Sequence, residues 1–380
     1  MRAQYGFDLL VVGAGILGLA HAYAAAKRGL KVAVLDRSVA ARGASVRNFG
    51  FITVSGQEAG DCWQKARRSR DVWAEVAAAA KIPVLHEGLL VTARRPEAEA
   101  VIDAFLATEM ADGCRRLTLA EARQITPALR DGITAVLHSP HELRVESRTA
   151  IPQLAAFLAE TYAVDFFFGV EVRAIAPPQI MTTQSEFRAG AVVVCPGASR
   201  YTLFHDAIAQ FGMTDCQLHM LRLQPERPLA LGTAIMSDLG LARYLGYAAL
   251  PEAAPLKARL DAEQAAHRAM GVHLIAVQSA DGSLVVGDSH EYGRDPDDLR
   301  KADIDDLILS ELDAVLDTGP RRVSEEWLGV YPSAADGWLK RASPDGATRL
   351  VVVSAGCGAS TAFAIGEETV DDLFGRRLEA

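Results

Sequence analysis

The stretch DLLVVGAGILGLAHAYAAAKRGLKVAVLD, residues 8–36, decides the fold. It begins with a short apolar run, typical of a strand buried on both faces of a parallel sheet. A glycine-rich turn, an apolar repeat at helical spacing, a second apolar run and Asp36 follow in that order. The turn has the pattern Gly-x-Gly-x-x-Gly, with glycines at Gly13, Gly15 and Gly18. Together these features predict a βαβ unit that binds a dinucleotide.

Each glycine of this turn has a separate task. Gly13 permits the tight turn, a side chain at Gly15 would keep a pyrophosphate from the backbone, and Gly18 lets the helix pack against the strand. The helix N-terminus presents unpaired N–H groups and a positive dipole end to the phosphates. Asp36 is placed to accept both ribose hydroxyls. Its charge would repel a 2′-phosphate, which argues against an NADP-like ligand.

The bulk composition limits the class of protein. The chain has 380 residues, of which 50% are hydrophobic, and we expect a large core divided between two domains. Its formal net charge of −9 argues against a nucleic-acid partner and against binding to an anionic membrane. The first strand starts close to Met1 and no later apolar run reaches about eighteen residues, so we expect no signal peptide and no membrane span.

The cysteines and histidines do not suggest a metal site. The five cysteines are odd in number and far apart, at Cys62, Cys114, Cys195, Cys216 and Cys357. This spacing favours buried free thiols in a reducing cytoplasm. His138 and His141 lie three residues apart but lack further ligands. We therefore expect a soluble, cytoplasmic protein that holds no metal.

The chain ends much as it begins. An apolar run at 350–353 enters a glycine turn at Gly356 and Gly358, and a helix follows toward residue 373. Residues 37–57 predict a long loop. Helices are expected at 59–80, 96–109, 118–126, 147–162, 257–270 and 298–316, and strands at 88–93, within 164–175, and at 191–195, 273–278 and 284–287. Because the two ends of the chain carry the same pattern, we expect one cofactor domain that is built from separate segments of the chain.

The sequence resembles the D-amino-acid oxidase-like FAD-dependent oxidoreductases, the group that includes glycine and sarcosine oxidases. The resemblance runs nearly end to end and rests on VVGAGILGLA with Asp36, GVEVRAI at 169–175, VVVCPGAS at 192–199 and SAGCGASTAFAIG at 354–366. It implies an α/β fold with a discontinuous Rossmann-like FAD-binding domain and an α+β substrate-binding domain on a mixed or antiparallel sheet. The expected FAD domain comprises 1–80, 145–205 and 326–380, and the expected substrate domain comprises 81–144 and 206–325.

The resemblance also implies where FAD binds. The first glycine turn would hold the pyrophosphate, Asp36 the adenosine ribose and the backbone near Val172 the adenine. The last glycine turn would face the flavin ring, where its helix N-terminus stabilises negative charge on reduced flavin. Because Cys357 lies inside a tight turn, we expect non-covalent FAD rather than a thioether link. The expected contacts are Gly13, Gly15, Ile16, Leu17, Gly18, Asp36, Arg37, Ser45, Arg47, Asn48, Phe49, Gly50, Val172, Cys195, Pro196, Gly197, Gly356, Cys357, Gly358, Ala359, Ser360 and Thr361.

The implied reaction is oxidation of a small primary or secondary amine. The carbon next to nitrogen gives a hydride to flavin N5, the imine is hydrolysed, and O2 or another acceptor takes the electrons. No side-chain base is obligatory, because the flavin performs the difficult step.

Three segments resemble most a bacterial subgroup associated with aminophosphonate breakdown: ASVRNFGFI at 44–52, GDSHEYG at 287–293 and WLGVYPS at 327–333. Where many relatives carry Arg-Pro before the last glycine turn, this chain has Tyr331 and Pro332. A carboxylate-binding arginine is therefore not carried over. The expected substrate is an aminophosphonate or its N-methyl form.

Several residues are candidates for positioning the substrate. Arg47 offers an anion anchor in the long loop, or else a solvated side chain. His290 could bind an acidic group or tune the protonation of the amine, or be an ordinary loop histidine. Tyr331, on the same side of a strand as Trp327, could form a pocket wall or pack in the core. A structural salt bridge is the favoured interpretation for the segment with Arg243, Tyr244 and Tyr247, and donors to a phosphonate are the alternative.

The sequence is also compatible with other functions. A glycine, sarcosine or D-amino-acid oxidase is the nearest alternative. The first βαβ unit alone would permit an NAD-dependent dehydrogenase, although the second glycine turn argues against it. A non-catalytic flavoprotein subunit would carry the same cofactor motifs. The oligomeric state is not predicted.

Overall fold

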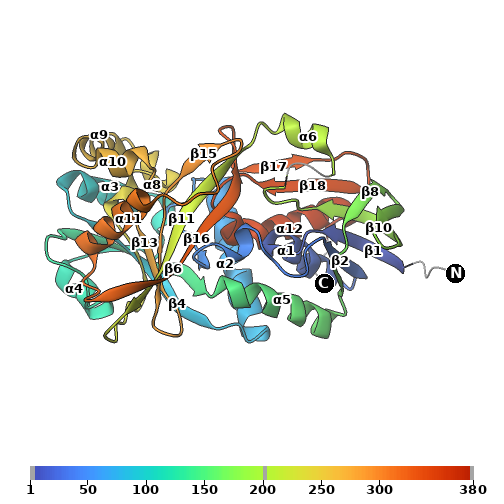
Figure 1. The fold of residues 1–380 in the computed structure, drawn as a ribbon, viewed down its shortest axis with the longest axis horizontal. Helices are drawn as coiled ribbons and strands as arrows, with labels where there is room; N and C mark the ends of the chain where they lie inside the picture. Colours follow the sequence, from blue (N-terminus) through green and yellow to red (C-terminus); the bar gives the residue numbers. More distant parts are fainter. Residues whose placement is uncertain (1–4, 200–202, 377–380) are drawn as a thin grey trace.

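The computed structural model describes residues 5–199 and 203–376, which form two lobes, each built around one mixed β-sheet (Figure 1). One lobe holds an eight-stranded sheet and the other a ten-stranded sheet. Both ends of the described chain lie in the eight-stranded lobe (Figure 1). The predicted fold class, an α/β protein with a Rossmann-like part and a mixed second sheet, is confirmed.

The eight-stranded sheet has a parallel centre. Its strand order is β17-β18-β10-β1-β2-β7, and β8 and β9 form a hairpin attached to β10. Strand β1 pairs in parallel with β10 and β2. Its Leu9 and Val11 pack against the helices, whereas Leu10 packs on the opposite face, so both faces are buried. The strands are β1 (Tyr5–Val12), β2 (Val32–Asp36), β7 (Asp165–Phe168), β8 (Val172–Ala176), β9 (Gln179–Thr182), β10 (Glu186–Val194), β17 (Leu339–Ala342) and β18 (Thr348–Val353).

Helices from the two ends of the chain lie side by side on this sheet (Figure 1). In α12, a Cβ on Gly366 would lie 2.7 Å from the Ala20 carbonyl oxygen of α1. Glycine at this position therefore permits the close approach of the first and last helices. The helices of this lobe are α1 (Ile16–Ala26), η1 (Ala44–Val46), α2 (Asp61–Ala79), α5 (Ser147–Tyr162), α6 (His205–Gln210) and α12 (Gly358–Phe374).

The ten-stranded sheet follows the order β15-β11-β14-β13-β12-β4-β6-β3, with β16 paired to β11 and β5 to β6. The long antiparallel pair β11 and β16 reaches toward the other lobe (Figure 1). The strands are β3 (Phe51–Ile52), β4 (Val84–Ala93), β5 (Arg115–Leu117), β6 (Ala135–Val145), β11 (Thr214–Pro225), β12 (Ala234–Met236), β13 (Ile275–Gln278), β14 (Leu284–Gly287), β15 (Glu291–Gly293) and β16 (Arg321–Ser333).

Apolar helix faces cover this second sheet. Ile304, Ile308 and Leu312 of α11 repeat at helical spacing and are buried against one face. Leu256 and Leu260 of α9 pack into the core on the other. The helices are α3 (Pro96–Leu106), η2 (Glu109–Ala111), α4 (Leu119–Ile125), α7 (Asp238–Leu241), α8 (Leu245–Ala248), α9 (Ala253–Glu263), α10 (Ala265–Ala269) and α11 (Ala302–Val315).

Most of the predicted elements are present, with shifted ends. The helix expected at 257–270 is wrong in detail, because it begins at Ala253 and is interrupted at Gln264, whose φ of −128° is not helical. The two strands expected within 164–175 exist, but β7 pairs with β2 and β8 with β9. The domain boundary expected at 326 falls inside β16, which belongs to the ten-stranded sheet along its whole length.

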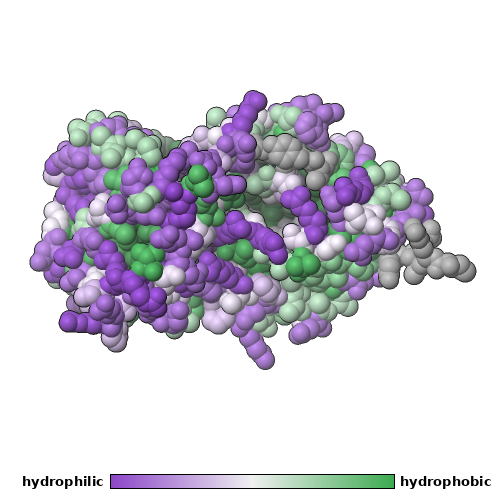
Figure 2. Space-filling model, in the orientation of Figure 1, coloured by the Kyte–Doolittle hydropathy of each residue, from purple (hydrophilic) through white to green (hydrophobic). Residues whose placement is uncertain are grey.

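Hydrophilic residues cover most of the face in Figure 2, with apolar residues in small separate patches and in a hollow near its middle. Within residues 5–199 and 203–376, no helix combines the length and the apolar character that crossing a bilayer requires.

Candidate active site

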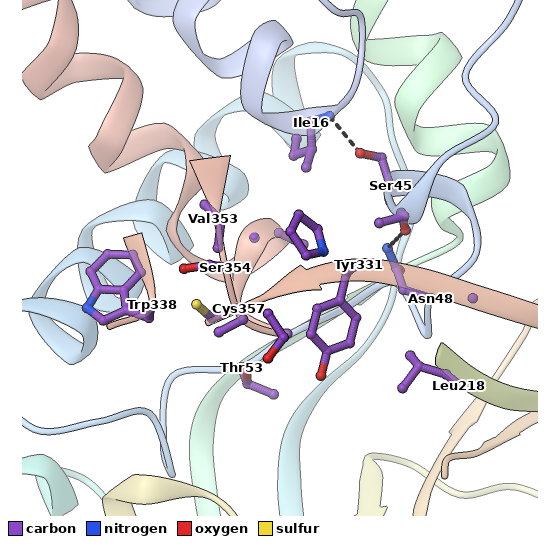
Figure 3. Close-up of a pocket in the computed structure, with 18 of the residues that line it drawn as sticks. Ile16, Ser45, Asn48, Thr53, Leu218, Tyr331, Trp338, Val353, Ser354 and Cys357 are labelled. Atoms are coloured by element: carbon purple, nitrogen blue, oxygen red, sulfur yellow. Dashed lines mark hydrogen bonds between the residues drawn. The ribbon is translucent and has the colours of Figure 1, made fainter. Parts of the chain in front are cut away.

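A continuous cavity of about 450 Å³ lies between the two lobes. This is within the range of ordinary small-molecule sites. The eight-stranded lobe contributes Gly15–Gly18 and Gly356–Ala359, and the ten-stranded lobe contributes Leu218 and His290, among others. Figure 3 shows side chains from both lobes, Cys357 from one and Leu218 and Tyr331 from the other, around this space.

The first glycine turn is shaped by contacts that no side chain could share. Gly13 has a φ of +107°, and a Cβ on Gly18 would lie 1.8 Å from the Gly13 carbonyl oxygen. A Cβ on Gly15 would lie 2.9 Å from the Ser45 hydroxyl oxygen. That hydroxyl accepts a 2.9 Å hydrogen bond from the Ile16 N–H at the start of α1 (Figure 3). Gly15–Gly18 line the cavity, so the N-terminus of α1 and its dipole face this space, and the Ile16 N–H is the one donor there that Ser45 already occupies.

Asp36 ends strand β2, as predicted, but its carboxylate already has two partners. It accepts hydrogen bonds from the N–H groups of Ala14, at 2.8 Å, and Ser38, at 2.8 Å. The carboxylate therefore fixes the glycine turn to the second strand, and it keeps lone pairs for a ribose. Asp36 lies outside the lining of the cavity, as do Gly13, Arg37, Gly50, Val172, Pro196, Ser360 and Thr361.

The second glycine turn opens helix α12. Cys357 is its N-cap residue and is buried, and its neighbours Gly356, Gly358 and Ala359 line the cavity. The Ser360 hydroxyl points away, accepting a 2.8 Å hydrogen bond from the Thr53 N–H. The helix N-terminus itself is therefore what this turn offers to a ligand. The Cys357 thiol and burial together raise the pKa of the Cys62 thiol beside it.

The loop at 44–50 holds itself in place through Asn48. The Asn48 amide donates to the Ala44 carbonyl at 2.7 Å, and its oxygen accepts from the Gly50 N–H at 2.6 Å. A Cβ on Gly50 would lie 1.8 Å from the Val145 carbonyl oxygen, so the loop fits tightly against β6. Arg47 lines the cavity, but its residue is exposed and its carbonyl accepts from the Trp327 indole N–H at 3.2 Å. Phe49 is buried beside the cavity.

Arg243 is a cation in the part of the cavity that the ten-stranded lobe lines. The Arg243 guanidinium donates a 2.7 Å hydrogen bond to the Tyr292 hydroxyl. Burial works to lower the pKa of Arg243, but the neighbouring Tyr292, Tyr331 and Asp288 outweigh it and the net shift is upward. Arg243 thus stays positively charged. Among the described residues it forms no salt bridge with a carboxylate.

Three more groups meet beside Arg243. His273, Asp288 and His290 each offer an atom within 4.8 Å of the others, and all three residues are buried. Desolvation lowers the pKa of both histidines well below its usual value, so both are neutral. Desolvation raises the pKa of Asp288 to about 8, with Arg243 opposing the shift. The spacing alone would admit a small cation.

The family model described as DAO, FAD dependent oxidoreductase, matches residues 8–372. The chain belongs to this family. It is an FAD-dependent oxidoreductase, as the sequence predicted. A search of curated protein sequences found no match.

Solved structures show the same fold at low identity. Glycine oxidase from Bacillus cereus ATCC 14579 is 17% identical with a TM-score of 0.76, over 98% of this chain and 96% of that one. Iminodiacetate oxidase from Chelativorans sp. BNC1 is 18% identical, with a TM-score of 0.72 over 98% and 96%. L-α-glycerophosphate oxidase from Mycoplasma pneumoniae, a structure with FAD bound, is 16% identical, with a TM-score of 0.74 over 97% and 95%.

The residues of the cavity fit FAD. The absence of a side chain at Gly15 and the position of the α1 N-terminus on the cavity suit a pyrophosphate, and the N-terminus of α12 lies along the same cavity. When bound, FAD supplies a ring that accepts a hydride equivalent from the substrate. The α12 dipole would stabilise the negative charge of the reduced ring.

The predicted substrate residues meet different outcomes. Tyr331 lines the cavity with His290, and their ring centroids lie 6.5 Å apart. Burial lowers the pKa of His290 well below its usual value, so His290 faces the cavity as a neutral imidazole, and both of its predicted roles stay predictions. Tyr247 is fully buried with its ring 4.7 Å from that of Phe105, so it is a core residue.

Two titratable residues beside Arg243, His273 and Asp288, were not predicted from the sequence. His273 had no local signal, since it precedes β13 as a single histidine in an apolar stretch. Asp288 lay inside the quoted segment GDSHEYG but was not singled out. Its burial at the end of a strand became evident only from the paired strands β13 and β14.

Proposed function

We propose that the protein oxidises a small primary or secondary amine that also carries an acidic group. The observation that supports this is Arg243, a charged side chain that faces the cavity with a tyrosine rather than a carboxylate as its partner. A guanidinium with free donors matches the oxygens of a phosphonate or carboxylate. The amine then lies between this anchor and the last glycine turn.

The acidic group that we favour is a phosphonate. Arg243 and the Tyr292 hydroxyl can both donate to it, and Tyr331 offers a third hydroxyl in the same cavity. A phosphonate has three oxygens, one more than a carboxylate, so a third donor favours the larger group. The segments at 44–52, 287–293 and 327–333, which carry the resemblance to the aminophosphonate subgroup, all contribute residues to this cavity.

The chain's own residues bind and orient the substrate. We assign cofactor binding to residues 1–80, 145–205 and 326–380 and substrate binding to 81–144 and 206–325, with Tyr331 of β16 reaching the substrate from across the boundary at 326. Apolar side chains such as Phe49, Phe51 and Leu218 line the cavity and exclude water from the reacting carbon. We also propose that FAD is bound non-covalently and that O2 or another acceptor reoxidises it. The proposed location is the cytoplasm.

Anaerobic mixing tests the substrate class. FAD-loaded protein is mixed with 2-aminoethylphosphonate, its N-methyl form, glycine, sarcosine and D-alanine, and loss of flavin absorbance is followed. We expect at least one phosphonate to reduce the flavin at least tenfold faster than every amino acid. Faster reduction by glycine or sarcosine would assign the protein to the amino-acid oxidases instead. Failure of every amine would favour a non-catalytic flavoprotein subunit.

A further inference from the structure

The three buried groups beside Arg243 are held in place by main-chain hydrogen bonds. His273 and Asp288 face each other across the ends of β13 and β14, where each N–H donates to the other's carbonyl, at 3.1 and 3.0 Å. His290 is oriented by its Nδ1, which lies 2.9 Å from the Gly271 carbonyl oxygen. Because that carbonyl can only accept, Nδ1 carries the proton and Nε2 presents a lone pair.

The polar atoms of this cluster lack the partners that burial requires. Asp288 Oδ1 lies 3.2 Å from His273 Nδ1, but the two are not aligned for a hydrogen bond and neither has another partner among the described residues. Asp288 Oδ2 lies 3.9 Å from His290 Nε2, which is beyond hydrogen-bond length. A buried carboxylate without donors is unfavourable, so these atoms are suited to a ligand that donates.

The number and spacing of the hydrogen-bond acceptors in this cluster match the donors of a primary ammonium group. His290 Nε2 and an Asp288 oxygen are acceptors, and a nitrogen of His273 lies within 4.8 Å of them. When His273 Nε2 donates to the Tyr244 hydroxyl, 3.5 Å away, Nδ1 of His273 is the third acceptor. Because no two of these atoms lie more than 4.8 Å apart, a single nitrogen can be placed about 2.8 Å from all three, which is the length of an N–H hydrogen bond. A primary ammonium carries three N–H donors.

We propose that Asp288, His273 and His290 bind the amino group of the substrate as a primary ammonium and that Asp288 accepts its proton. This rests on the proposed function, and Arg243 holds the acidic group at the other end of the same molecule. One N–H bond of the ammonium breaks and an O–H bond forms on Asp288, so the nitrogen regains its lone pair. The neutral amine is the form that can lose a hydride from the adjacent carbon.

The charges around Asp288 agree with this assignment. Arg243 is the cation that faces it, and the acidic group that Arg243 binds in the proposed complex offsets its repulsion of the ammonium. Burial raises the pKa of Asp288 to about 8, which places it close enough to an amine for proton transfer. The other titratable groups that face this part of the cavity are His273, His290, Tyr244, Tyr292, Tyr331, Cys216 and Cys357.

Binding of two non-oxidisable analogues to the FAD-loaded, full-length protein tests the proposal. The first is 2-aminopropan-2-ylphosphonate, which has no hydrogen on the carbon next to nitrogen, and the second is isopropylphosphonate, which lacks the amine. Titration calorimetry at pH 8.5 gives Kd for each. We expect Asp288→Asn to weaken binding of the amine analogue at least 30-fold and to change that of isopropylphosphonate less than twofold.

Two further variants separate function from folding. His290→Gln should weaken the amine analogue about threefold to tenfold and leave isopropylphosphonate unchanged. Asp295→Asn, at an exposed residue of the following loop, should change neither Kd. Flavin content and near-ultraviolet circular dichroism of each variant show whether it is folded.

Other outcomes would overturn the proposal. If wild-type protein binds isopropylphosphonate but gains less than threefold from the amine, the ammonium site is wrong while the acid anchor stands. If wild-type protein binds neither analogue, the proposed function fails as well. Stoichiometric zinc or another divalent metal in the wild-type protein, lost in Asp288→Asn, would assign the cluster to a metal ion instead.

Discussion

The two ends of the cavity are built in different ways. At the FAD end the chain presents backbone: glycines at 13, 15, 18, 356 and 358, and the N-termini of α1 and α12. At the substrate end it presents side chains, led by Arg243, which lies between α7 and α8, and by Asp288 and His290, which lie between β14 and β15. The cofactor site therefore depends on the absence of side chains at its glycines, whereas the substrate site depends on the charges and hydrogen-bonding groups of its side chains.

The largest effect is expected at the FAD end. Gly18→Ala places a Cβ 1.8 Å from the Gly13 carbonyl oxygen, and neither backbone segment can move without breaking the βαβ unit. We expect loss of folded, FAD-binding protein, measured as a drop of more than 10 °C in Tm or as insoluble expression. Gly6→Ala in the same strand β1 meets nothing within 4 Å and serves as the control. Normal flavin content in Gly18→Ala would show that the turn is less constrained than described.

The next effect concerns the substrate end. Arg243→Met removes the cation but keeps the aliphatic stem, and we expect kcat/KM for the acidic amine to fall by about 10² to 10³, mainly through KM. A loss of this size corresponds to about 3 to 4 kcal/mol, as for a charge-assisted anchor. Flavin content and Tm should stay near wild type. Arg259 is a surface arginine on α9, and Arg259→Met should leave kcat/KM within twofold of wild type. An equal loss of kcat/KM in Arg259→Met would show that Arg243 has no special role in substrate binding.

The dependence of binding on pH should be smaller. Because the pKa of Asp288 is raised to about 8, the free protein holds a proton on Asp288 at neutral pH and must release one to bind an ammonium. Affinity for the amine analogue should therefore rise about tenfold per unit from pH 6 to 8 and level off above pH 8, since Asp288 is then ionised. Isopropylphosphonate should not follow this profile. Calorimetry in buffers of different ionisation enthalpy should count close to one proton released at pH 6.5.

The smallest effect is expected at Cys357. Cys357 is the N-cap residue of α12, where we expect the backbone rather than the thiol to contact the ring, so FAD should be released completely when the protein is denatured in acid. Cys357→Ser should keep the same flavin content within about 20%. Flavin that remains attached to the denatured wild-type chain, and is lost in Cys357→Ser, would establish a covalent bond.

The sequence predicted the two ends of the cavity unequally. Gly13, Gly15, Gly18 and Asp36 lie within one short segment, so local sequence encodes the whole turn and its hydrogen bonds. The side chains of the substrate end meet only because β13 and β14 pair and because Arg243, between α7 and α8, lines the same cavity. No local pattern encodes that meeting, which is why Tyr247 was placed in the site and His273 was missed.

The central claim is that one cavity places an amine carrying an acidic group against the flavin end. Stopped-flow reduction of the bound FAD under anaerobic conditions, by 2-aminoethylphosphonate and by ethylamine at equal concentration, tests it most directly. The account predicts that the phosphonate reduces the flavin at least 100-fold faster, since only it can bind Arg243. Equal rates for the two amines, or no reduction by either, would contradict it.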